Sequence, residues 1–277
     1  MTAFLSPVRE VEPRPDPNTK PVTARYIRSY LWMRIGVGVL GILLPLVLVF
    51  VDQLAFHEDP FVRGSLSVYY FSGMRDEFVA ILSATGIFLL TYKVAERNLD
   101  NAASLLAGVC AVLIALFPTG RPSYSATGLT RLQEWLGESS VRWVHFVASA
   151  GFLVGLVAIS FFFGLREGQR PRRQGTHFPP KFWRWFHWSC TLAMVLALVW
   201  IVVTLAAGWP YRSLLIGEWV SAWAFGLSWL TKGAEWDMLR GNPHPEIGTS
   251  ELAGQPAPTE PQPPVSVSQT QRRPHLA

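Results

Sequence analysis

Charged residues are scarce in this sequence. Only 16% of the 277 residues are Asp, Glu, Lys or Arg, whereas 50% are hydrophobic and the mean hydropathy is +0.25. Soluble domains usually carry about 25% charged residues, so this composition favours helices that cross a membrane. The net charge of +5 is then assigned to loops that face membrane lipids. A nucleic-acid partner is not expected.

Cysteines and the short motifs of soluble enzymes are also scarce. The two cysteines, Cys110 and Cys190, both fall inside apolar runs, which excludes a disulfide framework and a Cys-rich metal site. The sequence has no G-x-S-x-G motif, no Gly-rich phosphate loop before a Lys and no haem-type Cys pair. No cofactor is expected, and no reaction is indicated.

Six long apolar runs are present. A helix needs about 20 residues to cross the hydrocarbon core, where a backbone without internal hydrogen bonds is too costly. The sequence therefore predicts an all-α polytopic membrane protein with a bundle of six transmembrane helices. The second run is short, so its helix has to begin near Arg75 and Asp76. The runs are residues 35–51, 78–92, 102–118, 144–165, 186–209 and 214–231.

The domain organisation follows from the positions of these runs. We expect a disordered N-terminal tail over residues 1–29, a transmembrane domain over residues 30–235 and a disordered, Pro-rich C-terminal tail over residues 236–277. No cleavable signal peptide is recognisable. Of the 24 basic residues, only 6 fall outside if the N-terminus is cytoplasmic. The positive-inside rule therefore predicts a multi-pass protein of the cell membrane with both termini in the cytoplasm.

The loop between the fourth and fifth runs is the most basic stretch of the chain. Arg170, Arg172 and Arg173 precede Trp183 and Trp185 at the entry to the fifth run. Basic and Trp side chains at a cytoplasmic border are typical of contacts with anionic lipids. The loop is therefore predicted to anchor on the inner leaflet.

Small residues repeat every four positions in three of the runs. Such stripes let helix backbones approach closely, so we expect them to face neighbouring helices. Contacts within one chain are the preferred interpretation, and a homo-oligomer through Gly151 and Gly155 is the alternative. The stripes are Ala107, Ala111 and Ala115; Gly151 and Gly155; and Ser189, Ala193 and Ala197.

Polar residues enter the predicted membrane domain mainly from the outer side. Because such residues are costly in hydrocarbon, they pair with one another or line a site. Glu218, Ser221, Phe225, Ser228 and Lys232 are spaced 3, 4, 3 and 4 residues apart, which places them on one helical face. We expect an outward-opening polar pocket, with a packing ion pair of Glu218 with Arg75, Arg121 or Arg212 as the alternative. The pocket residues are Ser67, Tyr70, Arg75, Asp76, Thr119, His145, Glu218 and Ser221.

Metal binding is a further possibility with a weaker pattern. His57, His145 and Asp76 share the outer side, but no H-x-x-x-H or H-E-x-x-H motif places two ligands on one helical face. His187 enters its run from the inner side and is therefore too far from His145 to share a metal. We therefore expect no metal site.

Several motifs together resemble a group of bacterial six-helix membrane proteins without an assigned activity. The motifs are S-V-Y-Y-F-S-G-M-R-D-E-F-V at 67–79, L-F-P-T at 116–119, His145, Glu218 and F-G-L-S-W-L-T-K-G at 225–233. The resemblance covers about residues 30 to 235 and implies a location in the bacterial plasma membrane. A more distant resemblance is to seven-helix hydrolases that include alkaline ceramidases, in which Ser, Asp and three His surround a zinc.

Three functional hypotheses result. The preferred one is a protein that binds a lipid headgroup or a small polar ligand in the outer pocket. The first alternative is a membrane-embedded, metal-dependent hydrolase that uses His145, Asp76 and His57 around an activated water. The third hypothesis is a small-solute transporter. It is weaker because transporters typically have interrupted helices, and Pro45 is the only proline in the middle of a run.

Overall fold

The computed structural model describes residues 20–56, 62–91, 99–169, 180–209 and 212–233. These residues form eight α-helices, one π-helical turn and one 3₁₀ helix, and none of the described residues lies in a strand. The elements are α1 (Lys20–Leu46), η2 (Val47–Val51), α2 (Asp52–Ala55), η3 (Leu66–Phe71), α3 (Arg75–Thr91), α4 (Leu99–Leu116), α5 (Arg131–Leu136), α6 (Glu138–Gln169), α7 (Pro180–Ala207) and α8 (Arg212–Gly233).

Four helical segments are long and apolar enough to cross a membrane: Trp32–Ala55, Leu99–Leu116, Glu138–Arg166 and Lys181–Ala207. The other two long helices, α3 and α8, are not among them. Helix α3 begins at Arg75, as predicted, and its 17 residues span about 26 Å. Helix α8 has 22 residues and includes Glu218, which lowers its apolar character. The described residues therefore form an all-helical protein with four candidate membrane spans.

The first helix differs from the prediction at both ends. Helix α1 begins at Lys20, within the segment predicted as a tail, and the adjacent Pro21 is tolerated because the first-turn N–H groups have no intrahelical partner. At the other end Pro45 removes a backbone donor, and the π-helical turn η2 follows directly. Helix α2 then completes the segment at Ala55.

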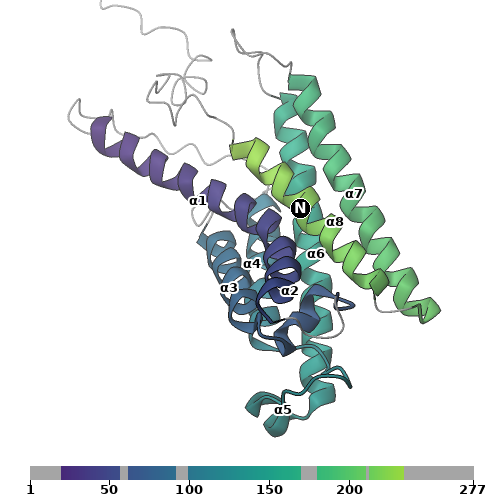
Figure 1. Ribbon diagram of the computed structural model, residues 1–277. Coiled ribbons are helices and arrows are strands. Elements are labelled where there is room, and N and C mark those ends of the chain that lie inside the picture. Colours follow the sequence, from purple (N-terminus) through teal and green to yellow (C-terminus); the bar gives the residue numbers. More distant parts are fainter. Residues whose placement is uncertain (1–19, 57–61, 92–98, 170–179, 210–211, 234–277) are drawn as a thin grey trace, which may run out of the picture.

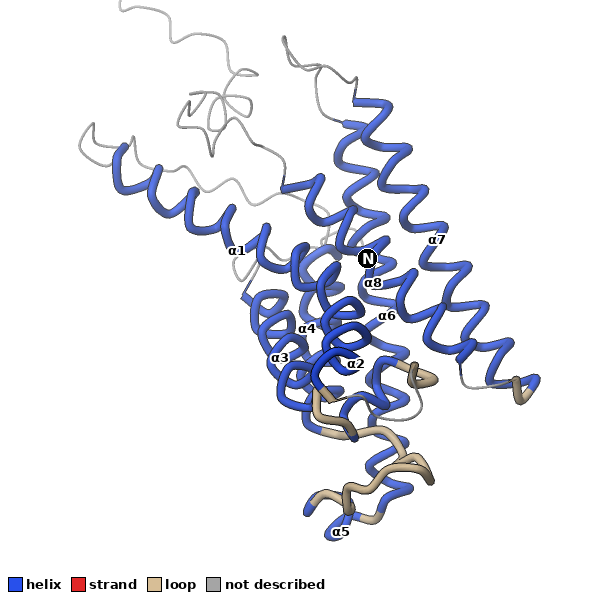
Figure 2. The backbone as a smooth tube through the Cα atoms, in the orientation of Figure 1, coloured by secondary structure: helices blue, strands red, loops and turns tan. Residues whose placement is uncertain are grey.

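The six longest helices pack in a ring in the order α1, α3, α4, α6, α7 and α8, and α8 closes the ring on α1. Helix α6 also contacts α8 across the ring. Helix α5 lies at the lower end of the molecule in Figure 1, and α2 lies above it at the lower end of α1. The described loops lie toward the same end (Figure 2). This end is called the loop end below.

Glycines allow the closest helix contacts. A Cβ atom on Gly226 of α8 would lie 2.9 Å from the carbonyl oxygen of Gly38 on α1. A Cβ atom on Gly86 of α3 would likewise lie 2.9 Å from the carbonyl oxygen of Gly108 on α4. These backbones approach so closely that a side chain does not fit without movement.

The predicted small-residue stripes are largely confirmed as packing faces. Ala107, Ala111 and Ala115 are all buried, and a Cβ atom on Gly155 would lie 2.8 Å from the Ala107 Cβ. Gly155 therefore packs within this chain. The α7 stripe was wrong at Ser189, which is exposed and donates its hydroxyl to the Phe186 carbonyl at 2.8 Å. The buried face of α7 instead runs through Cys190, Met194 and Ala197.

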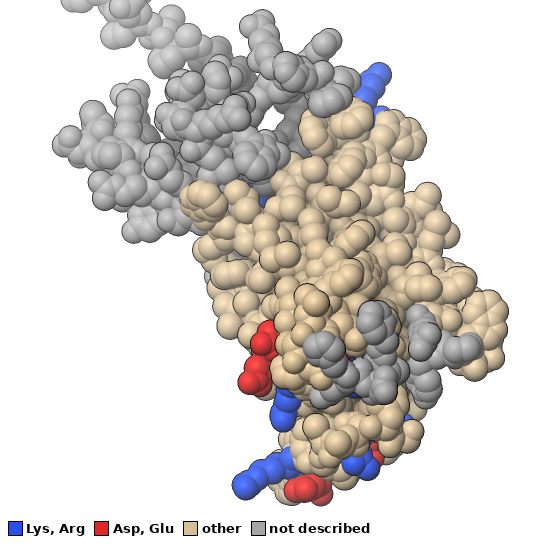
Figure 3. All heavy atoms as spheres, in the orientation of Figure 1, with Lys and Arg blue, Asp and Glu red and all other residues tan. Residues whose placement is uncertain are grey.

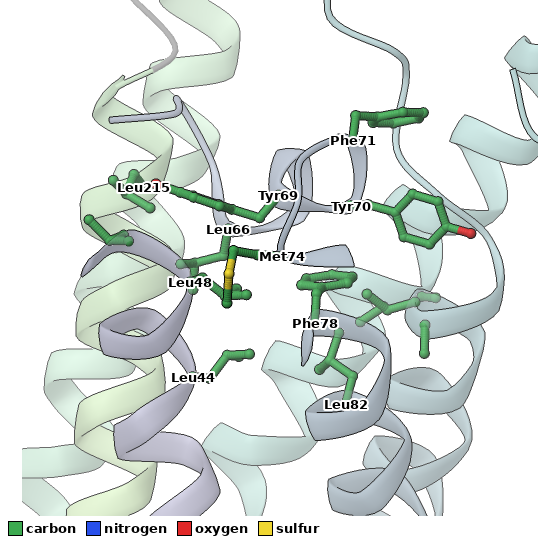
Figure 4. Close-up of a cluster of buried hydrophobic side chains, with 14 of the residues drawn as sticks. Leu44, Leu48, Leu66, Tyr69, Tyr70, Phe71, Met74, Phe78, Leu82 and Leu215 are labelled. Carbon is green, nitrogen blue, oxygen red and sulfur yellow. The ribbon is translucent and has the colours of Figure 1, made fainter. Parts of the chain in front are cut away.

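Two clusters of buried apolar side chains fill the ring. The first lies near the loop end and joins α1, η3, α3, α4, α6 and α8. In Figure 4, Leu48, Met74 and Phe78 lie between Leu215 on α8 and Leu82 on α3. The second cluster lies farther from the loop end and centres on Phe163, Phe225 and Trp229.

The outer surface of the ring is apolar. Large side chains such as Val147 on α6 and Leu192 on α7 are 68% and 58% exposed. On the face seen in Figure 3, charged side chains gather at the loop end and at the upper tip of the molecule, and the broad surface between them is nearly free of charge. This distribution suits a protein surrounded by hydrocarbon.

Replacing Gly226 by leucine should destabilise the fold by about 1 to 3 kcal/mol, because the new side chain overpacks the α1–α8 contact. Leucine has a higher helix propensity than glycine, so a loss can only come from packing. Both cysteines are buried, and a thiol-reactive dye therefore reports unfolding on heating in detergent. The matched control is Val220→Leu on an exposed position of the same helix. Equal unfolding temperatures for the two variants would contradict the close contact.

Candidate functional site

The polar residues of the loop end centre on Glu218, which is half-buried on α8. The Ser65 hydroxyl donates a hydrogen bond to one Glu218 carboxylate oxygen at 2.8 Å, and the Leu66 N–H donates to the other. Ser65 also accepts a hydrogen bond from the Ser67 N–H at 3.1 Å and so caps η3. Glu218 therefore holds the start of η3 against α8.

A backbone contact adds to this connection. The Leu215 N–H, in the first turn of α8, donates to the Gly64 carbonyl at 2.9 Å. The first N–H groups of a helix have no intrahelical acceptor, so this carbonyl satisfies one of them. Residues 64–66 thus make three hydrogen bonds to α8.

A buried ion pair holds the same loop against the end of α1 and α2. Arg63 Nε lies 3.3 Å from Asp52 Oδ2, and the two residues are 1% and 0% exposed. The Arg63 guanidinium also lies 5.6 Å from the centre of the Tyr69 ring. The backbone N–H of Arg63 donates a hydrogen bond to the Tyr69 hydroxyl at 3.4 Å. Burial raises the pKa of the Tyr69 phenol, which therefore stays neutral. The sequence analysis did not identify Asp52 or Arg63.

Arg75 and Tyr70 form a second, more exposed arrangement. The Arg75 Nη2 atom donates to the Tyr70 hydroxyl at 2.9 Å, and the guanidinium lies 4.6 Å from the centre of the Tyr70 ring. Arg75 and Asp76 are exposed at the start of α3, whereas Ser67 is half-buried. Arg75 is thus a cation held in place on the surface.

His145 and Thr119 serve a different part of the loop end. His145 is 1% exposed, and its Nδ1 atom lies 2.7 Å from the Phe117 carbonyl oxygen. The Thr119 carbonyl accepts a hydrogen bond from Gln133 Nε2 at 3.3 Å. These contacts fix the exit of α4 against α6 and α5. Ser221 is buried on α8, on the face that was predicted to point inward.

The structure thus brings Glu218 together with Ser65, and Arg75 together with Tyr70. Within the described part of the chain, neither Arg75 nor Arg121 pairs with Glu218: the Arg121 guanidinium donates instead to the Thr127 carbonyl at 3.1 Å. The Arg212 side chain lies outside the described residues. The hydrogen bonds of Glu218 and His145 share no partner, and the first apolar cluster lies between α8 and α3 (Figure 4).

A second polar cluster lies in the half of the ring remote from the loop end. His187 Nδ1 lies 2.9 Å from Ser228 Oγ, which lies 2.7 Å from Ser160 Oγ. All three residues are buried and come from α7, α8 and α6. The sequence analysis treated His187 as an isolated residue. In the sequence, only the position of Ser228 on the same helical face as Glu218 indicated this cluster.

Metal and lipid-anchoring predictions remain predictions. Among the residues that the structure describes, no group of three or more His, Cys, Asp or Glu could hold a metal ion. His57 lies outside the described residues, as do Arg170, Arg172 and Arg173 of the basic loop. Trp185 is 62% exposed on α7, and Trp183 is half-buried.

Comparison of the chain with protein-family models, with curated proteins and with solved structures found no match. The two resemblances of the sequence motifs remain hypotheses.

Proposed function

We propose that the chain is a six-span protein of the bacterial plasma membrane that binds a lipid headgroup or a small polar ligand at its loop end. The membrane part of this proposal is supported by the packing. Helices α3 and α8 each pack between two of the candidate spans: α3 between α1 and α4, and α8 between α7 and α1. This packing supports the inference that α3 and α8 cross the membrane together with their neighbours.

The direction of the chain in the membrane follows from the basic residues. Six spans place both termini on the same side, and the positive-inside rule makes that side the cytoplasm. The loop end then faces outward, and the basic loop between α6 and α7 faces the inner leaflet.

The observation that carries ligand binding is the fixed cation at Arg75. Its guanidinium is held by the Tyr70 hydroxyl at 2.9 Å and by the Tyr70 ring, yet it remains exposed at the membrane border. A guanidinium in a fixed position binds phosphate or carboxylate well. The neighbouring Asp76 is exposed too and offers a partner for an amine. This pair of opposite charges fits a zwitterionic headgroup. Glu218 holds the start of η3, the segment that carries Tyr70, against α8.

The test is the retention of phospholipid by purified protein. Arg75→Gln should lower the phosphatidylethanolamine that stays bound in native mass spectrometry by roughly tenfold, since a hydrogen bond to a charged group contributes about 1.5 to 3 kcal/mol. The matched control is Glu77→Gln, which removes an exposed charge two residues after Arg75. Retention that is equal in the two variants would contradict the proposal. Zinc in the same sample would favour the hydrolase hypothesis.

A further inference from the structure

A cavity on the outer surface of the ring provides a separate observation. It has a volume of about 420 Å³ and lies between α4 and α6. Helix α4 contributes Leu106, Cys110 and Leu113, and α6 contributes Trp143, Val147 and Gly151. Both helices belong to the four segments that are long and apolar enough to cross a membrane. The cavity is called the α4–α6 groove below.

The sequence of each helix explains the shape of the groove. The lining residues are spaced 4 and 3 positions apart on α4. On α6, Trp143, Val147 and Gly151 are each 4 positions apart and Val144 and Ala148 lie beside them, so each set forms one stripe along its helix. Two parallel stripes make a groove about 12 Å long. Gly151 and Cys110 pack tightly and close its base, because a Cβ added to Gly151 would lie 2.7 Å from the Cys110 sulfur. Val147 and Trp143, which are 68% and 64% exposed, form its edge.

The end of the groove nearest the loop end carries a positive charge. Arg142 is exposed and directly precedes Trp143. Its Cδ atom would lie 2.9 Å from a Cβ added to Gly120, which follows the end of α4. The Arg142 side chain therefore lies over the junction between the two helices, and an exposed Trp such as the neighbouring Trp143 is typical of a membrane border.

We propose that the α4–α6 groove binds one acyl chain of a membrane phospholipid, with the lipid phosphate next to Arg142. The surrounding medium decides the class of ligand, because a groove on the outer face of two membrane spans is reached from the hydrocarbon and not from water. Its volume falls within the range of about 300 to 1,000 Å³ that is common for ligand sites. The groove involves neither Arg75 nor Asp76, so it can be tested apart from the headgroup site.

The experiment uses the full chain in vesicles of phosphatidylethanolamine and phosphatidylglycerol. A trace phospholipid with a diazirine in its acyl chain is photolysed, and the labelled peptides are mapped by mass spectrometry. We expect labels to concentrate on residues 106–113 and 143–151 and to decrease when unlabelled phospholipid is added in excess. Val147→Trp places an indole in the groove and should lower this labelling by about tenfold, the effect of excluding one to two methylene groups.

Val154→Trp is the matched control, because Val154 is 50% exposed on the same helix and does not line the groove. It should leave the labelling unchanged, and the unfolding temperatures of both variants show that they fold. Labelling that is equal on α4, α6 and α7 and insensitive to Val147→Trp would mean ordinary contact with surrounding lipid and would overturn the proposal. Crosslinks between two chains across the groove would also overturn it, because a second copy would then occupy the site.

Discussion

Replacing Asp52 by alanine should lower the free energy of unfolding by about 3 to 5 kcal/mol, the usual cost of removing one partner from a buried ion pair. Asp52 and Arg63 are both almost completely buried, and 3.3 Å separates the Arg63 Nε from the Asp52 carboxylate. Without the carboxylate, the Arg63 charge stays buried with poorer compensation. The measurement is thermal unfolding in detergent with a thiol-reactive dye that reports on the buried Cys110 and Cys190.

The control for Asp52 is a double variant. Asp52→Leu combined with Arg63→Met removes both charges and keeps similar volumes, so it should recover much of the loss. If the single alanine variant unfolds at the temperature of the original protein, the ion pair does not hold the loop at Arg63 in place, which would contradict the prediction.

The second large effect is expected at Glu218. Glu218→Leu leaves the Ser65 hydroxyl and the Leu66 N–H without their acceptor, at a cost of about 1 to 3 kcal/mol for each group. Glu218→Gln keeps a carbonyl oxygen at the same place and should be clearly more stable than Glu218→Leu. The same thiol assay measures the order of stability. A leucine variant that is at least as stable as the glutamine variant would show that Glu218 faces lipid.

The helices were predictable because their signal is local. Each of the six apolar runs lies largely within a helical segment, and α3 begins at Arg75, where the length of a membrane span required it. The stripe from Ala107 to Ala115 is buried as expected, because helical periodicity alone places these residues on one face. The exposed Ser189 shows the limit of this argument. Periodicity groups residues on a face but does not say which face of α7 meets its neighbours.

The contacts of the candidate site were not predictable because they join distant parts of the chain. The sequence indicated that Glu218 points inward, but its partners were sought among arginines. The structure gives it neutral donors from Ser65 and Leu66, which are separated from it by 153 and 152 residues. In the same way, His187 and Ser228 meet only because α6, α7 and α8 pack together. The order of helices in the ring, which decides these pairings, has no signature in the sequence.

The loop end shows how a helical membrane protein can fix a loop that lies outside its helices. Hydrogen bonds from residues 64–66 to α8 and the Arg63–Asp52 pair hold this loop on two sides. Helix η3 and residues 72–74 connect this loop to Arg75 at the start of α3. The proposed ligand site therefore follows closely in the chain on the loop that these contacts hold, and loss of the support at Asp52 or Glu218 should weaken ligand retention together with stability.

We expect α3 and α8 to cross the membrane together with the four apolar segments. The most direct test is a set of reporter fusions that distinguish the cytoplasm from the outside. Six spans predict outside signals that alternate with cytoplasmic signals along the chain. The fusion points, in order from the first outside position, are Ser67, Ala95, Tyr124, Arg173, Trp209 and Lys232. Fusions at Ser67 and Ala95 on the same side would show that α3 does not cross, and fusions at Trp209 and Lys232 on the same side would show this for α8. Either result would contradict the six-span account, whereas strict alternation with both termini in the cytoplasm is the result that it predicts.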